Sequence, residues 1–103
     1  MDIYSYNPPL FKINESCAHL STLVISDLGF KEYGWVVAYL LMGIEEPTNE
    51  KWRFSFLALF RLSPDDFDAV MNVLAYMYKL NKKPRDLFGT EFVDFAKALY
   101  SPP

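Results

Sequence analysis

Apolar side chains recur three and four residues apart along the segment 63–80, which is the spacing that places them on one face of an α-helix. Ser63 is a favourable N-cap, and Pro64 suits the first helical position because its missing N–H group would have no partner there. Three aspartates in the following residues favour the positive end of the helix dipole. The apolar face comprises Phe67, Val70, Met71, Leu74, Met77 and Tyr78. The pattern therefore predicts a helix over residues 63–80.

The first half of the chain has weaker patterns of the same kind. A helix is expected over about 15–28, with Asn14 as its N-cap. Apolar residues in the segment 31–44 also follow helical spacing, although the segment is rich in residue types that favour strands. Before both helices, residues 1–13 are expected to form an extended strap, because two consecutive prolines restrict the backbone there.

After residue 80 the pattern predicts two more short helical pieces. The segment 84–89 is long enough for a single turn. A last helix is expected over about 91–100, with Thr90 as its N-cap. The apolar face of that helix is predicted to contain Phe92, Phe95, Ala96 and Leu99.

The segment 52–62 is ambiguous. Its large apolar residues partly alternate with polar ones, as they would in a strand, and a strand here could pair with 35–42 as a hairpin. We favour a helix, because Leu57 and Leu59 interrupt the polar side that such a strand would need.

The elements together predict an all-α protein, a compact helical bundle of about five helices with short connections. The alternative is an α+β fold with a hairpin formed by 35–42 and 52–62. Residues 1–103 are expected to form a single globular domain with the extended strap at its N-terminal end, because a chain of this length supports one core.

Composition adds that the chain is rich in aromatic residues and mildly acidic. Phe, Tyr and Trp make up 17% of the residues, more than so small a core usually needs. The formal net charge of −3 has the wrong sign for general nucleic-acid binding and suits a basic protein partner. No apolar run is long enough to span a membrane, and the chain does not open on a secretory signal, so a cytoplasmic protein without a membrane partner is expected.

Residues that could perform catalysis are scarce. Cys17 and His19 are the only candidates for a nucleophile and a base, and two residues apart on a helix they point to different faces. They cannot complete a zinc site. Asp65, Asp66 and Asp68 do not have the spacing of an EF-hand loop, and they are better explained as charges at a helix N-terminus. We therefore expect no enzyme activity and no cofactor or metal.

Four basic residues, Lys79, Lys82, Lys83 and Arg85, gather in the segment 79–85. A positive helix end that complements the dipole explains them best. A small RNA-binding protein that uses this cluster is the alternative.

Acidic and aromatic residues are mixed along the chain, as in Glu45-Glu46-Pro47-Thr48-Asn49-Glu50-Lys51-Trp52. In this mixing, and in its size and charge, the chain resembles the small immunity proteins of bacterial toxin systems, including contact-dependent growth inhibition. The resemblance implies a protein that binds a cognate toxin, often a nuclease domain, and covers its active site.

Carboxylates that face a basic active site, with an aromatic anchor beside them, would suit that role. The predicted partner-binding residues are Glu45, Glu46, Glu50, Trp52, Asp65, Asp66 and Asp68. Trp52 and Trp35 are expected to be partly exposed. The other possibility of this kind is a phage or host adaptor that inhibits a different nucleoprotein machine.

Overall fold

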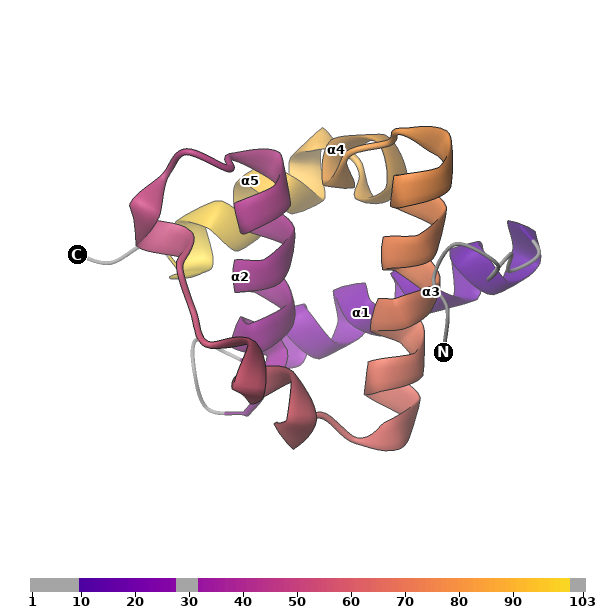
Figure 1. The fold of residues 1–103 in the computed structure, drawn as a ribbon, viewed down its shortest axis with the longest axis horizontal. Helices are drawn as coiled ribbons and strands as arrows, with labels where there is room; N and C mark the ends of the chain where they lie inside the picture. Colours follow the sequence, from indigo (N-terminus) through magenta and orange to yellow (C-terminus); the bar gives the residue numbers. More distant parts are fainter. Residues whose placement is uncertain (1–9, 28–31, 101–103) are drawn as a thin grey trace.

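The computed structural model describes residues 10–27 and 32–100, and in this part of the chain it contains helices and no strand (Figure 1). The elements are α1 (Leu10–Ser26), α2 (Gly34–Glu45), the 3₁₀ helices η1 (Glu50–Trp52) and η2 (Phe56–Arg61), α3 (Pro64–Leu80), α4 (Pro84–Phe88) and α5 (Thr90–Tyr100). The prediction of an all-α bundle with about five helices is therefore confirmed.

Helix α2 is the centre of the bundle. It contacts α1, α4, α5 and η1, while α3 packs mainly against α1. In the view of Figure 1, α2 and α3 run in roughly parallel directions, with α1 crossing at one level and α4 and α5 at the other. Buried side chains occur around most of α2, which explains why its sequence is apolar on nearly all sides.

A single hydrophobic cluster joins the helices. It includes Leu20 and Val24 of α1, Val70 of α3, and Val93 and Tyr100 of α5, which are all almost completely buried. Because helices far apart in the sequence contribute to the same cluster, no helix has a core of its own.

Helix α1 starts earlier than predicted. It begins at Leu10, so Asn14 is an interior residue rather than the N-cap, and residues 10–13 are helical rather than extended. Ile13 is 1% exposed and continues the buried face of Leu20, which requires the helix to have started before it. The rest of the predicted strap, residues 1–9, lies outside the described residues.

The segment 52–62 is helical in part, as we favoured, and does not form the strand of the alternative hairpin, but its helices are short. Two 3₁₀ helices, η1 and η2, occupy it with an extended link between them. Side chains cap both: Asn49 Oδ1 accepts a hydrogen bond from the Lys51 N–H at 3.2 Å, and Ser55 Oγ accepts one from the Leu57 N–H at 3.2 Å. Hydrogen bonds between a side chain and a nearby backbone N–H group compete with the backbone bonds of a longer helix or strand.

The C-terminal half follows most of the predictions, but Thr90 is the first residue of α5 rather than its N-cap, and Tyr78 of the predicted apolar face of α3 is 55% exposed. Helix α3 has Ser63 as its N-cap and ends at Asn81, which adopts the left-handed conformation. In α5 the buried residues are Val93, Ala96 and Tyr100, while Phe95 is 47% exposed. The predicted face was therefore rotated, because it gave the large phenylalanines more weight than the smaller valine that reaches the core.

None of the helices within residues 10–27 and 32–100 has the length and apolar character needed to cross a membrane.

Candidate functional site

Acidic side chains gather at the N-terminal end of α3. Ser63 Oγ accepts a hydrogen bond from the Asp66 N–H at 3.2 Å and so caps the helix. The first turns that follow carry the three aspartates, of which Asp65 and Asp68 are exposed and Asp66 is half-buried. The local sequence therefore presents three carboxylates at a helix end where unpaired backbone N–H groups favour negative charge.

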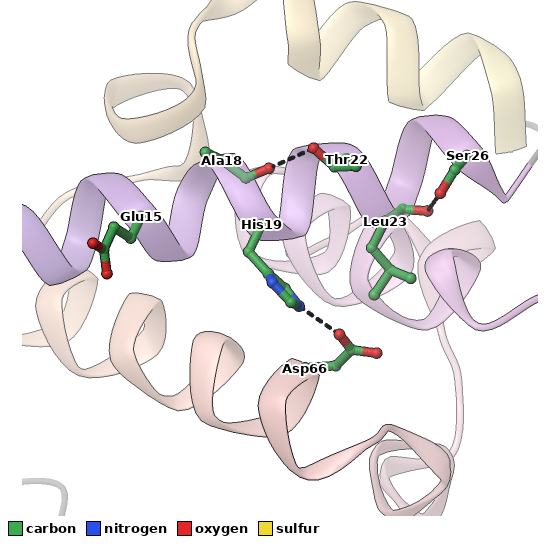
Figure 2. Close-up of a pocket in the computed structure, with 7 residues that line it drawn as sticks. All are labelled: Glu15, Ala18, His19, Thr22, Leu23, Ser26 and Asp66. Carbon is green, nitrogen blue, oxygen red and sulfur yellow. Dashed lines mark hydrogen bonds and ion pairs between the residues drawn. The ribbon is translucent and has the colours of Figure 1, made fainter.

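His19 of α1 reaches across to this cluster (Figure 2). Its Nε2 lies 2.5 Å from Asp66 Oδ1, so the ring N–H can donate a hydrogen bond to the carboxylate. The side chain of His19 is 42% exposed and that of Asp66 is 19% exposed. The pair joins two helices whose residues are far apart in the sequence, and it holds the Asp66 carboxylate in one orientation.

An open groove runs along the junction of α1 and α3 on both sides of His19. One part has a volume of about 530 Å³ and extends toward Leu23 and Ser26, and the other has about 310 Å³ and extends toward Asn72. Glu15 and His19 line both parts. We call this feature the acidic groove; its charged or ionisable lining residues are Lys12, Glu15, His19, Asp65, Asp66 and Asp68.

The carboxylates of the acidic groove outnumber its cations. Lys12 Nζ lies 3.9 Å from Glu15 Oε2, at the edge of ion-pair distance. Asn72 Nδ2 donates a hydrogen bond to Ser16 Oγ at 3.0 Å and lines the floor with a neutral pair. Within the described residues, no group of three or more metal-binding side chains is placed to hold a metal ion. The groove is suited to lysine and arginine side chains of another molecule.

The acidic residues Glu45, Glu46 and Glu50 lie outside the acidic groove, and two of them are bonded to other parts of the fold. Glu45 accepts a hydrogen bond from the Arg85 N–H at 3.1 Å, and its second oxygen lies 3.4 Å from Arg85 Nε. Glu50 is exposed and forms an exposed ion pair with Arg53 at 3.1 Å. The structure therefore brings the three aspartates together but separates them from Glu45 and Glu50.

Glu46 is the centre of a polar cluster that also includes Lys97, Asn49 and Trp52. Lys97 Nζ donates to Oε2, while Asn49 Nδ2 and Trp52 Nε1 donate to Oε1 at 2.8 and 3.1 Å. The Lys97 bond, and then those from Asn49 and Trp52, lower the pKa of Glu46 to about 2, although burial acts in the opposite direction. The Glu46 carboxylate therefore joins the segment 46–52 to α5.

Trp52 is not partly exposed, so that prediction is wrong. Its side chain is 2% exposed, and its ring packs edge-to-face with Tyr39 at a centroid distance of 5.4 Å. Trp35, for which partial exposure was also predicted, is half-buried, in agreement with the prediction. Trp52 was expected to be a surface anchor because it follows a polar segment. In the structure the half-buried Tyr39 ring is its apolar partner and the Glu46 carboxylate is its polar partner.

Cys17 and His19 point to different surroundings, as predicted from their spacing. Cys17 is half-buried and packs against the core cluster, and burial raises the pKa of its thiol from 9.0 to about 11. His19 faces the acidic groove.

The basic residues of the segment 79–85 have different surroundings and do not act as one cluster. Arg85 contacts both Glu45 and Asp94, the latter at 3.0 Å, so it serves the packing of α4 against its neighbours. Lys82 and Lys83 are exposed.

The pairing of His19 with Asp66 and the participation of Glu15 were not predicted from the sequence. The available signal was the polar spacing along α1, where Glu15, His19 and Thr22 follow one another at four and three residues and so share a face. This face of α1 lies opposite the aspartates of α3 because of the way the two helices cross. A local sequence pattern does not predict that crossing.

Comparisons of the chain with protein-family models, with curated proteins and with solved structures found no match.

Proposed function

We propose that this protein is a non-enzymatic, stoichiometric binding protein, and specifically an immunity protein that neutralises a cognate toxin by covering the basic active site of a nuclease domain. The observation that carries the proposal is the acidic groove, around which Glu15, Asp65 and Asp68 are exposed. The proposal needs no cofactor, because occlusion of an active site is a binding event.

The physical basis is electrostatic complementarity. A nuclease active site holds phosphate with cationic side chains, and carboxylates on an inhibitor can occupy the same positions. A surface of opposite charge also raises the rate of diffusional encounter. Because His19 already holds the Asp66 carboxylate at 2.5 Å, less conformational freedom remains to be lost there on binding.

The contact residues that we propose differ from those predicted from the sequence. Asp65, Asp66 and Asp68 remain, and Glu15 joins them. We leave out Glu45, Glu46 and Trp52, because a partner would first have to break their bonds within the protein. Glu50 is exposed but belongs to a separate region of the surface.

The test removes charge from the acidic groove without changing side-chain shape. In the double variant Asp65→Asn and Asp68→Asn, the association rate with toxin nuclease domains should fall about tenfold at low ionic strength, because steering is lost. The difference from the wild-type protein should shrink as salt is added. Stopped-flow or biosensor kinetics over a salt series, with inhibition of nuclease activity, measures both effects.

The matched control is the double variant Glu50→Gln and Glu91→Gln. It removes the same number of charges, and Glu91, like Asp65, lies in the first turn of a helix. Association should be nearly unchanged in the control. Equal slowing in both double variants would show that only net charge matters and would contradict the proposed site. Salt-sensitive RNA binding that Lys82→Glu and Lys83→Glu remove would support the RNA-binding alternative instead.

A further inference from the structure

Helix η2 turns two large apolar side chains toward solvent. Leu57 is 72% exposed and Phe60 is 76% exposed. Residues three apart in a 3₁₀ helix lie on the same side of its axis, so these two side chains form one apolar pair. Their neighbours Ala58 and Leu59 pack against the core. Helix η2 therefore has an inner face that belongs to the core and an outer apolar face that does not.

The pair is presented on a turn that is bonded at both ends. At the start, Ser55 Oγ accepts from the Leu57 N–H at 3.2 Å, and the Ser55 carbonyl accepts from the Ala58 N–H at 3.0 Å. At the end, the Leu62 N–H donates to the Leu59 carbonyl at 3.2 Å, and the Leu62 side chain is buried. A turn held in this way pays little ordering entropy when its outer side chains are bound.

Helix η2 lies shortly before the aspartates at the start of α3 along the chain. Phe60 precedes Asp65 by five residues, which places their Cα atoms no more than about 18 Å apart. Figure 1 shows η2 beside the end of α3 at which that helix begins. Each partner in a standard protein–protein interface contributes about 800 Å². One interface can therefore include both the apolar pair and the aspartates, with the exposed Arg61 between them.

We propose that Leu57 and Phe60 are the apolar anchor through which this protein binds a basic protein partner. They would enter an apolar depression on the partner, while Asp65 and Asp68 face lysine and arginine side chains at its rim. The basic character of this partner rests on the function proposed above. What this inference adds is an apolar depression on the partner, next to its cationic site, because the exposed pair needs an apolar surface against which it can be buried.

Charge complementarity selects this occupant over a second copy of the chain. Each copy of the chain carries a formal net charge of −3, and this shared negative charge opposes the association of two copies. A basic partner meets Asp65 and Asp68 with opposite charge. The two parts of the surface then have different kinetic roles: the carboxylates govern association, and the desolvated apolar anchor governs dissociation.

The experiment measures both rate constants for the double variant Leu57→Ala and Phe60→Ala against basic toxin nuclease domains. Both side chains are mostly exposed, so their truncation should leave the fold intact, and circular dichroism checks this. We expect the dissociation rate to rise at least about tenfold while the association rate stays within about twofold of the wild-type value. Phe95→Ala is the matched control, because it truncates another exposed phenylalanine, on α5, and should change neither rate.

The outcomes separate this inference from the proposed function. If the Asp65 and Asp68 variants slow association but the Leu57 and Phe60 variant dissociates like Phe95→Ala, the anchor is wrong and the acidic groove stands. If the anchor variant dissociates faster and the aspartate variants associate normally, the anchor stands and the electrostatic mechanism fails. Failure of every basic nuclease domain to bind overturns both. Sedimentation velocity tests self-association: a dimer that Phe60→Ala dissociates would assign the pair to a second copy and overturn the proposal.

Discussion

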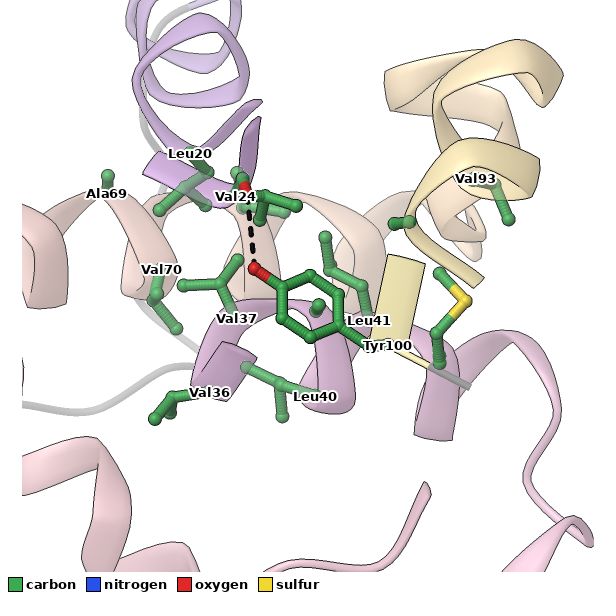
Figure 3. Close-up of a cluster of buried hydrophobic side chains, with 14 of the residues drawn as sticks. Leu20, Val24, Val36, Val37, Leu40, Leu41, Ala69, Val70, Val93 and Tyr100 are labelled. Atoms are coloured by element: carbon green, nitrogen blue, oxygen red, sulfur yellow. Dashed lines mark hydrogen bonds between the residues drawn. The ribbon is translucent and has the colours of Figure 1, made fainter. Parts of the chain in front are cut away.

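At the scale of single residues, Tyr100 shows how one hydroxyl can join three helices. It is the last residue of α5, and its hydroxyl donates to Asp27 Oδ2 at 2.7 Å. The hydroxyl also lies 3.1 Å from the Val24 carbonyl oxygen (Figure 3). Asp27 is completely buried and also accepts from the backbone N–H groups of Glu32 and Trp35, beside the start of α2. A buried carboxylate is tolerated here because each oxygen has a donor.

Replacing Tyr100 by phenylalanine should destabilise the protein. The ring would still fill its place in the core, but Asp27 Oδ2 would lose its hydroxyl donor while remaining buried. The free energy of unfolding should fall by about 1–3 kcal/mol. Urea unfolding followed by circular dichroism measures this change. Tyr33→Phe is the control, because Tyr33 is exposed, and it should differ from the wild-type protein by no more than about 0.5 kcal/mol.

The Glu46 cluster predicts a pH dependence of stability. The pKa of Glu46 is about 2 in the folded protein and near 4.5 when it has no partners, so the folded state favours the ionised form. The stabilisation is complete above about pH 4.5 and is lost as the pH falls toward 2. The stability difference between the wild-type protein and Glu46→Gln should therefore be constant near neutral pH and shrink through this acid range.

Urea unfolding at several pH values tests the prediction, and the side-chain carboxyl signal of Glu46 in NMR gives its pKa directly. Glu50→Gln is the control, because Glu50 and Arg53 form an exposed ion pair, and its effect should be small at every pH. A Glu46 pKa near 4.5 in the folded wild-type protein would show that the bond from Lys97 does not form in solution.

At the scale of elements, the crossing of α1 and α2 depends on a glycine. A Cβ atom at Gly34 would lie 2.5 Å from the Leu23 carbonyl oxygen and 2.6 Å from Asp27 Cβ, which is closer than such atoms can approach. The α2 glycine at position 43 has no such constraint, since the nearest atom to its Cβ position is the Trp52 carbonyl oxygen at 4.0 Å. The two glycines lie in the same helix and have opposite packing environments.

Alanine substitution at the two positions should therefore have opposite effects. Gly34→Ala should lower the free energy of unfolding by about 1–3 kcal/mol, because the helices must separate to admit the methyl group. Gly43→Ala should raise it by about 0.5–1 kcal/mol, because alanine favours the helix and its Cβ would make only an ordinary van der Waals contact, at 4.0 Å from the Trp52 carbonyl oxygen. Thermal unfolding of the two variants measures both. Destabilisation by Gly43→Ala equal to that by Gly34→Ala would indicate that helix geometry, not the close approach at Gly34, decides the outcome.

The helices were predicted accurately where interactions between neighbouring residues decide the structure, and less accurately where contacts between distant parts of the chain decide it. Helix α3 was predicted closely because Ser63, Pro64 and Asn81 act on neighbouring backbone groups. For the segment 52–62 the choice of helix over strand was correct, but the division into two 3₁₀ helices was not predicted. Its course depends on Trp52, whose ring packs against Tyr39 of α2 and whose indole N–H bonds to Glu46. Helix α5 was found, but its buried face was assigned wrongly, since only the assembled core shows that Val93 rather than Phe95 points inward.

At the scale of the whole molecule, stability should be greatest in α2 and least at η2. Buried residues of α2, among them Val37 and Leu41, contact several other helices, whereas η2 packs through one face only. Amide hydrogen exchange of α2 should therefore require global unfolding, while the bonded amides of Ala58 and Leu62 should exchange through local opening. Exchange measured at low urea concentrations distinguishes the two, because only global opening has the full denaturant dependence. Equal dependence in both elements would contradict this gradient.

The sequence by itself determined the all-α class, the ends of α3 and the positions of α4 and α5 to within a residue or two, because caps, prolines and apolar spacing act over a single turn. The gathering of Asp65, Asp66 and Asp68 is likewise local. Only the tertiary structure decided that His19 meets Asp66, that Glu46 collects three donors, and that Trp52 is buried. Each of these depends on how helices cross. The same packing buries Trp52 and leaves Leu57 and Phe60, a few residues before α3, exposed.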